Sequence, residues 1–376
     1  MKKLNISIFA ISMSKGGAEK VISILLPYLI KDYNVSLVLL VDDIKYDIPS
    51  RVKIHTINTS RSSLNRILTF PKSIVKYYNF VKRNNIDISI SFLIRPNIIN
   101  GLMRYFFRDM KIIISERCYP SIAYKSSRMK YYLYKFLIPF TYNNANFVFS
   151  NSYHINTDLQ TNFQITTPLK LLYNPVILPI DFKRRIVNDL SIIKLITVGS
   201  LYYVKNQKLI INSLIHFREN FILTILGDGV LMNDLQALTV KNNLSDKIIF
   251  KGTVDNVNDF LNESDIFILS SDTEGFPNCI LEAMAMGLPI ISTNCKSGPL
   301  EILNENKAIE IGKGKFKIAK YGILIETNDE IGLTNALNFL AYNRELKKEL
   351  SRLSLIRASH YNSERIYSEF RLLLNL

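Results

Sequence analysis

The chain is short of the residues that several special classes of protein require. Its 376 residues include no tryptophan, only three cysteines and only 14 glycines. This composition excludes collagen-like and disulfide-scaffold proteins, and a hydrophobic content of 48% excludes a disordered chain. No apolar run reaches the roughly 18–20 residues that a membrane-spanning helix needs. Cys118, Cys279 and Cys295 lack metal-site spacing. We interpret them as reduced thiols, in the core or near the functional site, of a cytoplasmic protein.

Acidic residues are scarce in the first half of the chain. Residues 1–190 hold 27 Lys and Arg against 11 Asp and Glu, a net charge of +16, whereas residues 191–376 hold 20 against 21. This asymmetry indicates that the first half faces an anionic partner, which is a nucleic acid, a phospholipid surface or a phosphorylated acceptor. The alternative is that the base composition of the gene favours codons for lysine. That would not explain why the second half of the chain is nearly neutral.

Basic and aromatic residues are interleaved in segments 101–111 and 124–140. Further basic residues cluster nearby: Lys72, Lys76, Lys82 and Arg83. This arrangement suits the headgroup region of an anionic leaflet, and a polyprenyl-diphosphate acceptor would need the same groups. The alternative is a set of ordinary helices with aromatic residues in the core and lysines in solvent. We therefore predict a peripheral protein on the inner face of the plasma membrane.

Short apolar runs alternate with helix-compatible stretches along the chain. In the first half, strands are predicted at 4–10, 35–41, 88–93, 111–115 and 146–150. Apolar residues recur at helical spacing at 67, 74, 75, 78 and 81. Two prolines and a charged cluster at 174–190 predict a linker. A second series of strands is predicted at 194–200, 221–229, 247–252, 266–271 and 288–293.

Strands that alternate with helices form parallel sheets covered on both faces. Two such series in tandem predict an α/β protein with two facing, doubly wound, Rossmann-like domains. Ligands of such domains bind in the cleft at the carboxyl ends of the strands.

The segment 266–301 carries the densest set of functional signals. Its predicted strand leads into a polar turn with Glu274, and Pro277 suits the first turn of the helix that follows. The helix is predicted to run to Gly287, which suits a left-handed helix end. Glu274 therefore precedes this helix, and Glu282 lies on it.

The start of that helix is a predicted anion site. The backbone amides around Phe276 and Asn278 and the positive end of the helix dipole favour a negative charge there. The two glutamates can meet the neutral hydroxyl groups of a ligand on either side of the anion. A phosphate between two hydroxyl-rich ends describes a nucleotide sugar.

The motif E-G-F-P-N-x-x-x-E-A-M-A-x-G-x-P-x-I resembles the donor-site signature of retaining glycosyltransferase family 4, which has the GT-B fold. Further matches follow in the expected order over nearly the whole chain: SKGGAEKV at 14–21, SER at 115–117, VGSLYYVKNQ at 198–207, LGDG at 226–229, FKG at 250–252, SDIF at 264–267 and SGPLEIL at 297–303. The resemblance implies an N-terminal acceptor-binding domain (1–180) and a C-terminal nucleotide-sugar domain (181–360). A final helix (361–376) would pack back toward the first domain.

The resemblance also implies roles for individual residues. Glu274 would hold hydroxyls of the transferred sugar, Lys205 would neutralise the leaving diphosphate, and Glu282 would bind the ribose. Glu274 and Lys205 are thus the predicted catalytic pair. The predicted donor-binding set is Gly16, Gly17, Ser200, Asn206, Gly227, Asp228, Gly275, Phe276, Pro277, Asn278 and Glu282. Taken alone, Lys205 also fits a solvated lysine, Glu282 a helix-surface carboxylate and Gly16–Gly17 an ordinary strand-to-helix turn.

Ser200 departs from the family pattern, which usually has arginine at this position. An arginine forks onto two phosphate oxygens, whereas a serine offers one neutral donor. Either a basic residue from elsewhere replaces the second diphosphate cation, or catalysis depends more on Lys205 and the helix amides.

The SER segment departs from relatives that place a histidine near the sugar at this strand end. Ser115, Glu116, Arg117 and Cys118 stand there, a variant that resembles members acting on lipid-linked oligosaccharides. The implied acceptor-binding residues are Glu19, Glu116 and Arg117. A buried Glu116–Arg117 pair is the structural alternative.

The sequence therefore predicts a retaining hexosyl- or N-acetylhexosaminyltransferase. It would move a sugar from a nucleotide donor to a lipid-linked glycan in surface-polysaccharide biosynthesis. UDP is the expected nucleotide because it is the most frequent one in this family. No metal or other cofactor is expected, and no nucleic-acid partner. One alternative is a GT-B-like epimerase or a phosphorylase, although the pyridoxal-phosphate lysine motif of phosphorylases is not evident. A degenerate binding subunit, favoured only by Ser200, and a nucleic-acid binder, suggested only by basicity, are the others.

Overall fold

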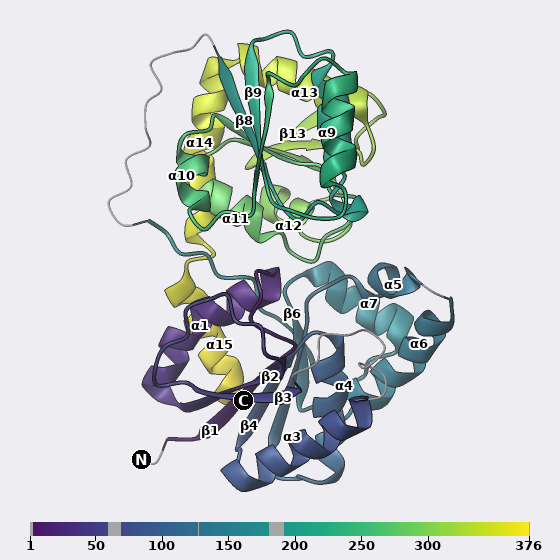
Figure 1. The fold of residues 1–376 in the computed structure, drawn as a ribbon, viewed down its shortest axis with the longest axis vertical. Coiled ribbons are helices and arrows are strands. Elements are labelled where there is room, and N and C mark those ends of the chain that lie inside the picture. The colour runs from purple at the N-terminus through teal and green to yellow at the C-terminus, as the bar shows by residue number, and fades with distance from the viewer. Residues whose placement is uncertain (1–2, 59–68, 127, 180–191, 376) are drawn as a thin grey trace. The chain divides into compact units, whose positions relative to one another are not determined.

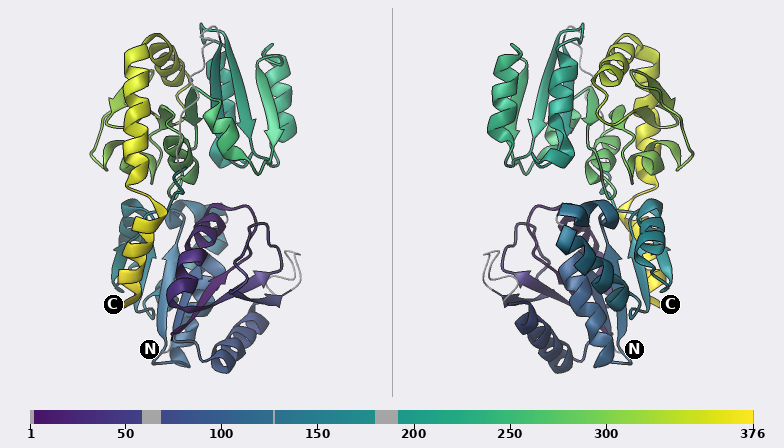
Figure 2. Two further views of the ribbon diagram at one scale, coloured as in Figure 1. Left: turned by 90° about the vertical axis from the view of Figure 1, so that its left-hand side faces the viewer. Right: turned by 90° about the vertical axis from the view of Figure 1, so that its right-hand side faces the viewer.

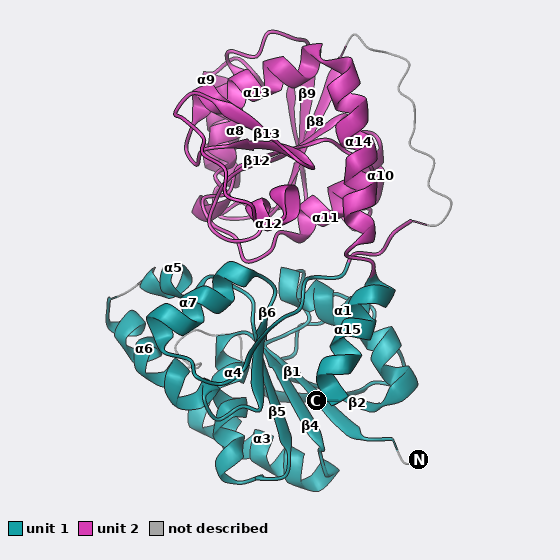
Figure 3. Ribbon diagram, turned by 180° about the vertical axis from the view of Figure 1, so that it is seen from behind, with its two compact units in different colours: residues 1–175, 363–376 teal, residues 176–362 magenta. Residues whose placement is uncertain are grey.

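A computed structural model describes residues 3–58, 69–126, 128–179 and 192–375. The chain divides into unit 1, residues 1–175 with 363–376, and unit 2, residues 176–362 (Figure 3). Most of the predicted linker and the predicted helical position 67 lie outside the described residues. No helix among the described residues is long and apolar enough to cross a bilayer.

Unit 1 is built on a seven-stranded parallel sheet (Figure 1). The strand order is β3-β2-β1-β4-β5-β6-β7. The strands are β1 (Asn5–Ala10), β2 (Asn34–Val41), β3 (Lys53–Asn58), β4 (Ile88–Phe92), β5 (Lys111–Glu116), β6 (Phe147–Ser150) and β7 (Leu169–Leu171). The helices are α1 (Gly17–Asp32), α3 (Phe70–Asn84), α4 (Ile94–Leu102), α5 (Pro120–Ala123), α6 (Arg128–Tyr142), α7 (Tyr153–Phe163) and α15 (Ser363–Asn375), with short 3₁₀ turns η1 (Met103–Tyr105) and η2 (Tyr124–Ser126).

The sheet of unit 1 has a hydrophobic core on each face. Successive side chains of a strand point to opposite faces, so Ile6 and Ile8 of β1 enter one core and Phe9 enters the other. The first core is completed by α1 and α15, and the second by α3, α4, α6 and α7. Burial on both faces explains why β1, β2 and β4 consist mostly of apolar residues.

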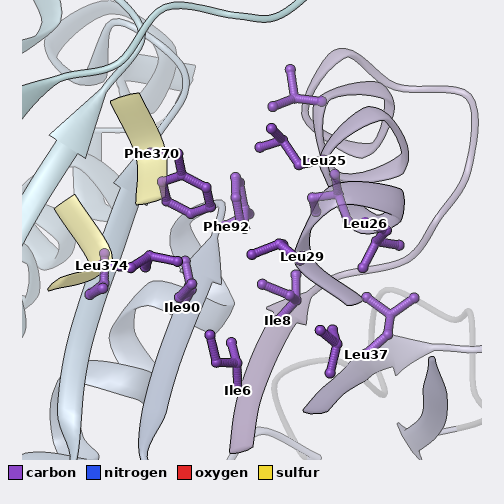
Figure 4. Close-up of a cluster of buried hydrophobic side chains, with 14 of the residues drawn as sticks. Ile6, Ile8, Leu25, Leu26, Leu29, Leu37, Ile90, Phe92, Phe370 and Leu374 are labelled. Atoms are coloured by element: carbon purple, nitrogen blue, oxygen red, sulfur yellow. The ribbon is translucent and has the colours of Figure 1, made fainter. Parts of the chain in front are cut away.

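The C-terminal helix α15 is part of unit 1. Phe370 and Leu374 point into the core beneath β4 and β6 (Figure 4), and the Phe370 ring lies 5.6 Å from that of Phe149. The phenol of Tyr367 donates a 2.7 Å hydrogen bond to Asp32 on α1. The side views show α15 running alongside α1 and the sheet (Figure 2). Residues more than 330 positions apart in sequence therefore close one core.

Phe370→Ala should destabilise the protein by about 3–5 kcal/mol, because it removes a fully buried aromatic ring from this core. Urea denaturation followed by circular dichroism would measure the free energy of unfolding. Leu372→Ala is the matched control, since Leu372 lies on the same helix and is 68% exposed. Equal effects of the two substitutions would contradict the packing of α15 in the core.

Unit 2 repeats the doubly wound plan with one added hairpin. The strand order is β10-β9-β8-β11-β12-β14-β13, and only the edge strand β13 is antiparallel to its neighbour. The strands are β8 (Ile193–Val198), β9 (Phe221–Leu226), β10 (Ile248–Gly252), β11 (Ile266–Leu269), β12 (Ile290–Thr293), β13 (Phe316–Ala319) and β14 (Gly322–Ile325). The helices are α8 (Gln207–Leu214), α9 (Met232–Lys241), α10 (Val257–Asn262), α11 (Asn278–Ala285), α12 (Pro299–Asn304), α13 (Glu330–Tyr342) and α14 (Arg344–Ser359), and η3 (Tyr203–Lys205) follows β8.

All ten predicted strands are present, and the predicted α/β class with two Rossmann-like sheets is confirmed. The sequence did not predict β3, β7, β13 and β14. Three of these lie at sheet edges. An edge strand has one neighbour and tolerates polar residues, as in the KIHTIN segment of β3, so its hydrophobic pattern is weak. The fourth, β14, is a buried run of only four residues.

Candidate active site

Lys205 and Glu274 lie at the point where the strand order of unit 2 reverses. The strands β8 and β11 are adjacent, but the chain continues outward from β8 through β9 and β10 before it returns to β11. Lys205 ends η3 after β8, and Glu274 stands in the loop after β11. Loops diverge at such a switch point, and the gap at the carboxyl ends of the strands is the usual ligand site of this architecture.

The two side chains form a short ion pair. Lys205 Nζ donates a hydrogen bond of 2.6 Å to Glu274 Oε1, which also accepts one of 2.6 Å from Ser271 Oγ. The Lys205 side chain is 24% exposed and the Glu274 side chain 8%. The pair is therefore mostly shielded from water. Electrostatic interactions are stronger in such a buried environment than at the surface.

The two loops that carry this pair are tied to each other. Ser270 Oγ donates to the backbone oxygen of Lys205 at 2.8 Å, and the Asp272 N–H donates to the oxygen of Val204 at 2.9 Å. Asn206, in a left-handed conformation (φ 48°), donates through Nδ2 to Asp272 at 3.1 Å and to Asn328 at 2.7 Å. These bonds fix the backbone on both sides of Lys205. Asn206 thus stabilises the conformation of the loop that carries Lys205.

The charges of the site act on one another. Burial alone would lower the pKa of the Lys205 ammonium, but the charge and hydrogen bond of Glu274, together with Cys279 and Cys295, outweigh burial and raise it above its ordinary value. Burial, together with the Glu274 and Glu282 carboxylates, raises the pKa of the Cys279 thiol to about 12, although Lys205 opposes the shift. The Cys279 thiol is therefore neutral near pH 7, and both glutamates and the ammonium influence it electrostatically.

The LGDG segment at 226–229, which follows β9, packs against the loop after β8. The N–H of Leu201 donates to the oxygen of Asp228 at 2.9 Å, and that of Gly199 donates to the oxygen of Leu226 at 2.9 Å. Gly227 has φ 134°, and a Cβ there would overlap the carbonyl oxygen of Gly199. Only glycine fits this close approach of two backbones. Ser200 itself is exposed beside this loop.

The predicted position of Pro277 in the first turn of the helix is wrong. The helix α11 begins at Asn278, and Pro277 precedes it in an extended conformation (φ −72°, ψ 106°). Two contacts hold this segment extended: Phe276 is buried with its ring 5.6 Å from that of Tyr361, and Ser297 Oγ donates to the oxygen of Gly275 at 2.6 Å. The predicted left-handed conformation of Gly287 is confirmed (φ 66°).

Gly16 and Gly17 lie where β1 meets α1 in unit 1. Gly16 is the extended residue before the helix, and Gly17 is its first residue. The Glu19 carboxylate folds back over Gly16, close enough that a Cβ on Gly16 would overlap it. Glu19 is 8% exposed, and burial raises its pKa. A carboxylate of the chain itself thus lies at this helix terminus, and the ligand roles of Gly16, Gly17 and Glu19 stay predictions.

Glu116 lies at the end of β5 in a closed hydrogen-bonded cluster. Its side chain is fully buried and accepts hydrogen bonds from the phenols of Tyr142 at 2.8 Å and Tyr124 at 3.3 Å. The backbone N–H groups of Arg117 (2.9 Å) and Cys118 (3.4 Å) donate to the same carboxylate, whose pKa burial raises. Glu116 therefore orders the loop after β5. A direct contact with an acceptor stays a prediction.

Several partners in these sites were not predicted from the sequence. They are Ser271 beside Glu274, and Tyr124 and Tyr142 around Glu116. Tyr124 falls in segment 124–140, where its basic neighbours favoured a surface interpretation, and Tyr142 lies two residues beyond that segment. The spacing of Ser271 and Glu274, three residues apart at a strand end, is the one signal that the sequence offered.

Two doubly wound units, with an ammonium–carboxylate pair at the switch point of the second, define a GT-B glycosyltransferase. Comparisons with known proteins agree with this class. The family model "Glycosyl transferases group 1" matches residues 193–343, the part of the chain that holds Lys205, Glu274 and Glu282. The chain is 30% identical over 372 residues, 97% of both chains, to the N-acetylgalactosamine-N,N'-diacetylbacillosaminyl-diphospho-undecaprenol 4-alpha-N-acetylgalactosaminyltransferase of Campylobacter jejuni. The chain therefore belongs to this family of glycosyltransferases and is an enzyme of that type.

Two further comparisons extend over the whole chain. The GalNAc-alpha-(1->4)-GalNAc-alpha-(1->3)-diNAcBac-PP-undecaprenol alpha-1,4-N-acetyl-D-galactosaminyltransferase of Campylobacter jejuni is 24% identical over 377 residues, 98% of this chain and 97% of that protein. The crystal structure of Anabaena HepE in complex with UDP and glucose superposes with a TM-score of 0.74, 16% identity and 99% coverage of both chains. The second likeness supports the GT-B fold alone.

Proposed function

We propose that this enzyme transfers an N-acetylhexosamine from a UDP-linked donor to a glycan carried on polyprenyl diphosphate, with retention of configuration. The ion pair between Lys205 and Glu274 at the switch point of unit 2 is the observation that carries the proposal. The sugar and the carrier follow from the names of two relatives, both N-acetylgalactosaminyltransferases acting on undecaprenol-linked diphosphates. Both relatives align with nearly the whole chain.

The geometry fits a mechanism based on electrostatic stabilisation. When the donor binds, its diphosphate takes the place of Glu274 as the partner of the Lys205 ammonium, and the Glu274 carboxylate accepts from hydroxyls of the sugar. The bond from the anomeric carbon to the diphosphate oxygen breaks, and the charge that develops there is stabilised by Lys205. The acceptor oxygen then bonds to that carbon on the same face, and its proton leaves with the diphosphate. Glu282 would bind the ribose.

Lys205 performs the charge neutralisation for which other transferases use a divalent cation. The proposal therefore includes transfer without a metal ion or other cofactor.

Product analysis would test the function. Purified enzyme would be given several UDP- and GDP-sugars, with and without a polyprenyl-diphosphate glycan, and released nucleotide and extended lipid would be measured in buffer with EDTA. We expect nucleotide release that requires acceptor and persists in EDTA. Interconversion of UDP-sugars without acceptor would instead identify an epimerase, and absence of turnover with every donor a binding subunit.

Ser200→Arg should lower the KM for the nucleotide sugar about 5- to 10-fold, because it adds the second cation that the diphosphate site lacks. Ser200 is exposed next to the Gly227–Gly229 loop, so the larger side chain has room. Steady-state kinetics at varied donor concentration would measure the effect. Tyr202→Arg is the control, because Tyr202 is 48% exposed two residues along the chain. An unchanged KM in Ser200→Arg would mean that another group already binds the diphosphate.

We also propose that unit 1 binds the anionic inner leaflet of the plasma membrane through α6. Large apolar side chains of this helix are exposed at helical spacing: Met129 (79%), Tyr132 (58%), Leu133 (53%), Phe136 (66%) and Phe140 (47%). Phe140 extends the apolar stripe to Tyr105 of η1, whose ring lies 6.1 Å away. The exposed residues Lys130 and Lys135 flank it. Aromatic and basic groups on one face suit the boundary between headgroups and acyl chains.

Replacing Leu133 and Phe136 together by serine should reduce binding to anionic vesicles about tenfold or more. The substitutions remove two apolar side chains that would insert at the boundary between headgroups and acyl chains. Co-sedimentation with vesicles of phosphatidylglycerol and phosphatidylcholine would measure it. Ile331→Ser in unit 2 is the control, since Ile331 is 63% exposed. Wild-type protein that fails to bind anionic vesicles even at low salt would overturn the membrane proposal.

A further inference from the structure

Arg117 has a buried guanidinium without a hydrogen-bond partner among the described residues. The residue is 8% exposed, and Nε, Nη1 and Nη2 are all buried and unpaired. Burial lowers the pKa of the Arg117 guanidinium to about 9, and the nearby Glu116 carboxylate opposes this shift only in part. A buried cation without a partner is costly and is uncommon unless a ligand uses it.

The neighbouring Glu116, the last residue of β5, does not pair with this guanidinium because the two side chains point to opposite faces of the sheet. Glu116 points to the face of Tyr124 and Tyr142, where phenols and backbone amides occupy its carboxylate. Arg117 points to the opposite face, where its guanidinium carbon lies 5.5 Å from the ring centre of Phe92 and 6.0 Å from that of Phe149. The buried Glu–Arg pair considered as an alternative from the sequence is therefore not formed.

The surroundings of Arg117 leave its charge uncompensated. Two ring faces attract a cation, but they do not satisfy the five N–H donors at its edge. A second unpaired polar atom lies at the same strand ends. Asn151 directly follows β6, and the pairing of Glu116 with Ser150 places it next to Arg117 in register. Its Oδ1 is buried without a partner, and the residue is 3% exposed.

We propose that Arg117 binds the diphosphate of the lipid-linked acceptor, and that Asn151 Oδ1 accepts from the sugar joined to it. This inference rests on the proposed function and assigns the anion subsite of unit 1. A guanidinium forks onto two oxygens of a diphosphate, which a single ammonium cannot do. The donor diphosphate already has Lys205 in unit 2. Unit 1 holds the basic excess of the chain and the α6 stripe that suits a lipid carrier.

Binding requires the guanidinium to turn out from between Phe92 and Phe149, because its nitrogens are covered there. The backbone of Arg117 stays in place during this turn, since its N–H is held by Glu116. In the absence of a diphosphate the Arg117 guanidinium lies against Phe92 and Phe149, and it leaves these rings when a diphosphate binds.

Calorimetric titration of the full chain with farnesyl diphosphate and with UDP would test the inference, in wild type, Arg117→Met and Arg117→Lys. We expect Arg117→Met to weaken farnesyl diphosphate binding about 10- to 100-fold, the range for loss of a charged hydrogen bond, and to leave UDP binding within twofold. Arg117→Lys should be intermediate, and Arg51→Met, which removes an exposed arginine of unit 1, should be without effect.

The melting temperature separates a ligand role from a structural one. Removing an unpaired buried charge should leave the melting temperature of Arg117→Met unchanged or raise it, whereas a structural cation–π role predicts a fall. Unchanged binding of farnesyl diphosphate in Arg117→Met would overturn the inference, and so would loss of UDP binding instead. Wild-type protein that binds farnesyl diphosphate but transfers no sugar would contradict the proposed function while leaving the subsite intact.

Discussion

Lys205→Ala is expected to lower kcat about 100- to 1,000-fold, the usual effect of removing one group that stabilises charge in a transition state. The ammonium is mostly buried and held 2.6 Å from Glu274, and its loop is hydrogen-bonded to the loop after β11. It is therefore pre-organised for the diphosphate and needs no rearrangement of solvent during the reaction. The KM for the nucleotide sugar should rise as well, because the same group binds the ground-state diphosphate.

Steady-state kinetics with measured nucleotide release would check this result, and circular dichroism would confirm that the variant is folded. Lys208→Ala is the matched control, because Lys208 is exposed one turn away on α8. Near-normal turnover in Lys205→Ala would refute the assignment of the site. A loss of activity shared equally by both variants would point to a general effect on the segment formed by η3 and α8.

Glu274→Gln is expected to lower kcat/KM about 100-fold through the loss of charged hydrogen bonds to the transferred sugar. The amide keeps the size of the side chain and still accepts from Ser271, so the loop should retain its shape. The unfolding free energy should fall by about 2 kcal/mol, since the ammonium of Lys205 loses its partner but keeps some exposure to water. Glu310→Gln, an exposed glutamate of unit 2, is the control.

The same variant should change the pH dependence of kcat/KM. In the wild type the carboxylate raises the pKa of Lys205 above its ordinary value, so the ammonium remains charged up to pH 10. Burial lowers that pKa, and in Glu274→Gln burial acts without the opposing carboxylate. Rate profiles between pH 6 and 10 should therefore be flat on the alkaline side for the wild type and fall at lower pH for the variant. Identical profiles would show that Glu274 does not control the charge of Lys205.

Much of the candidate site could be predicted from the sequence because its residues lie at strand ends, where local patterns are strong. The apolar runs that end before Lys205 and Glu274 predicted two loops at the carboxyl ends of parallel strands, and the structure makes these strands neighbours and joins the two side chains. The start of α11 was misplaced, since Phe276 and Ser297 decide it through contacts that no local pattern reveals. The pairing of Glu116 with two tyrosines was missed for the same reason.

The periodicity of apolar residues alone determined that this chain forms two parallel α/β sheets, because burial on both faces requires nearly continuous apolar strands separated by helices. The spacing of glutamates around one predicted helix was equally local. The tertiary structure decided which charges meet. It pairs Lys205 with Glu274 across 69 residues and adds α15 to the first unit. It also separates Arg117 from the adjacent Glu116, because one side chain lies against Phe92 and Phe149 and the other against Tyr124 and Tyr142 on the opposite face of the sheet.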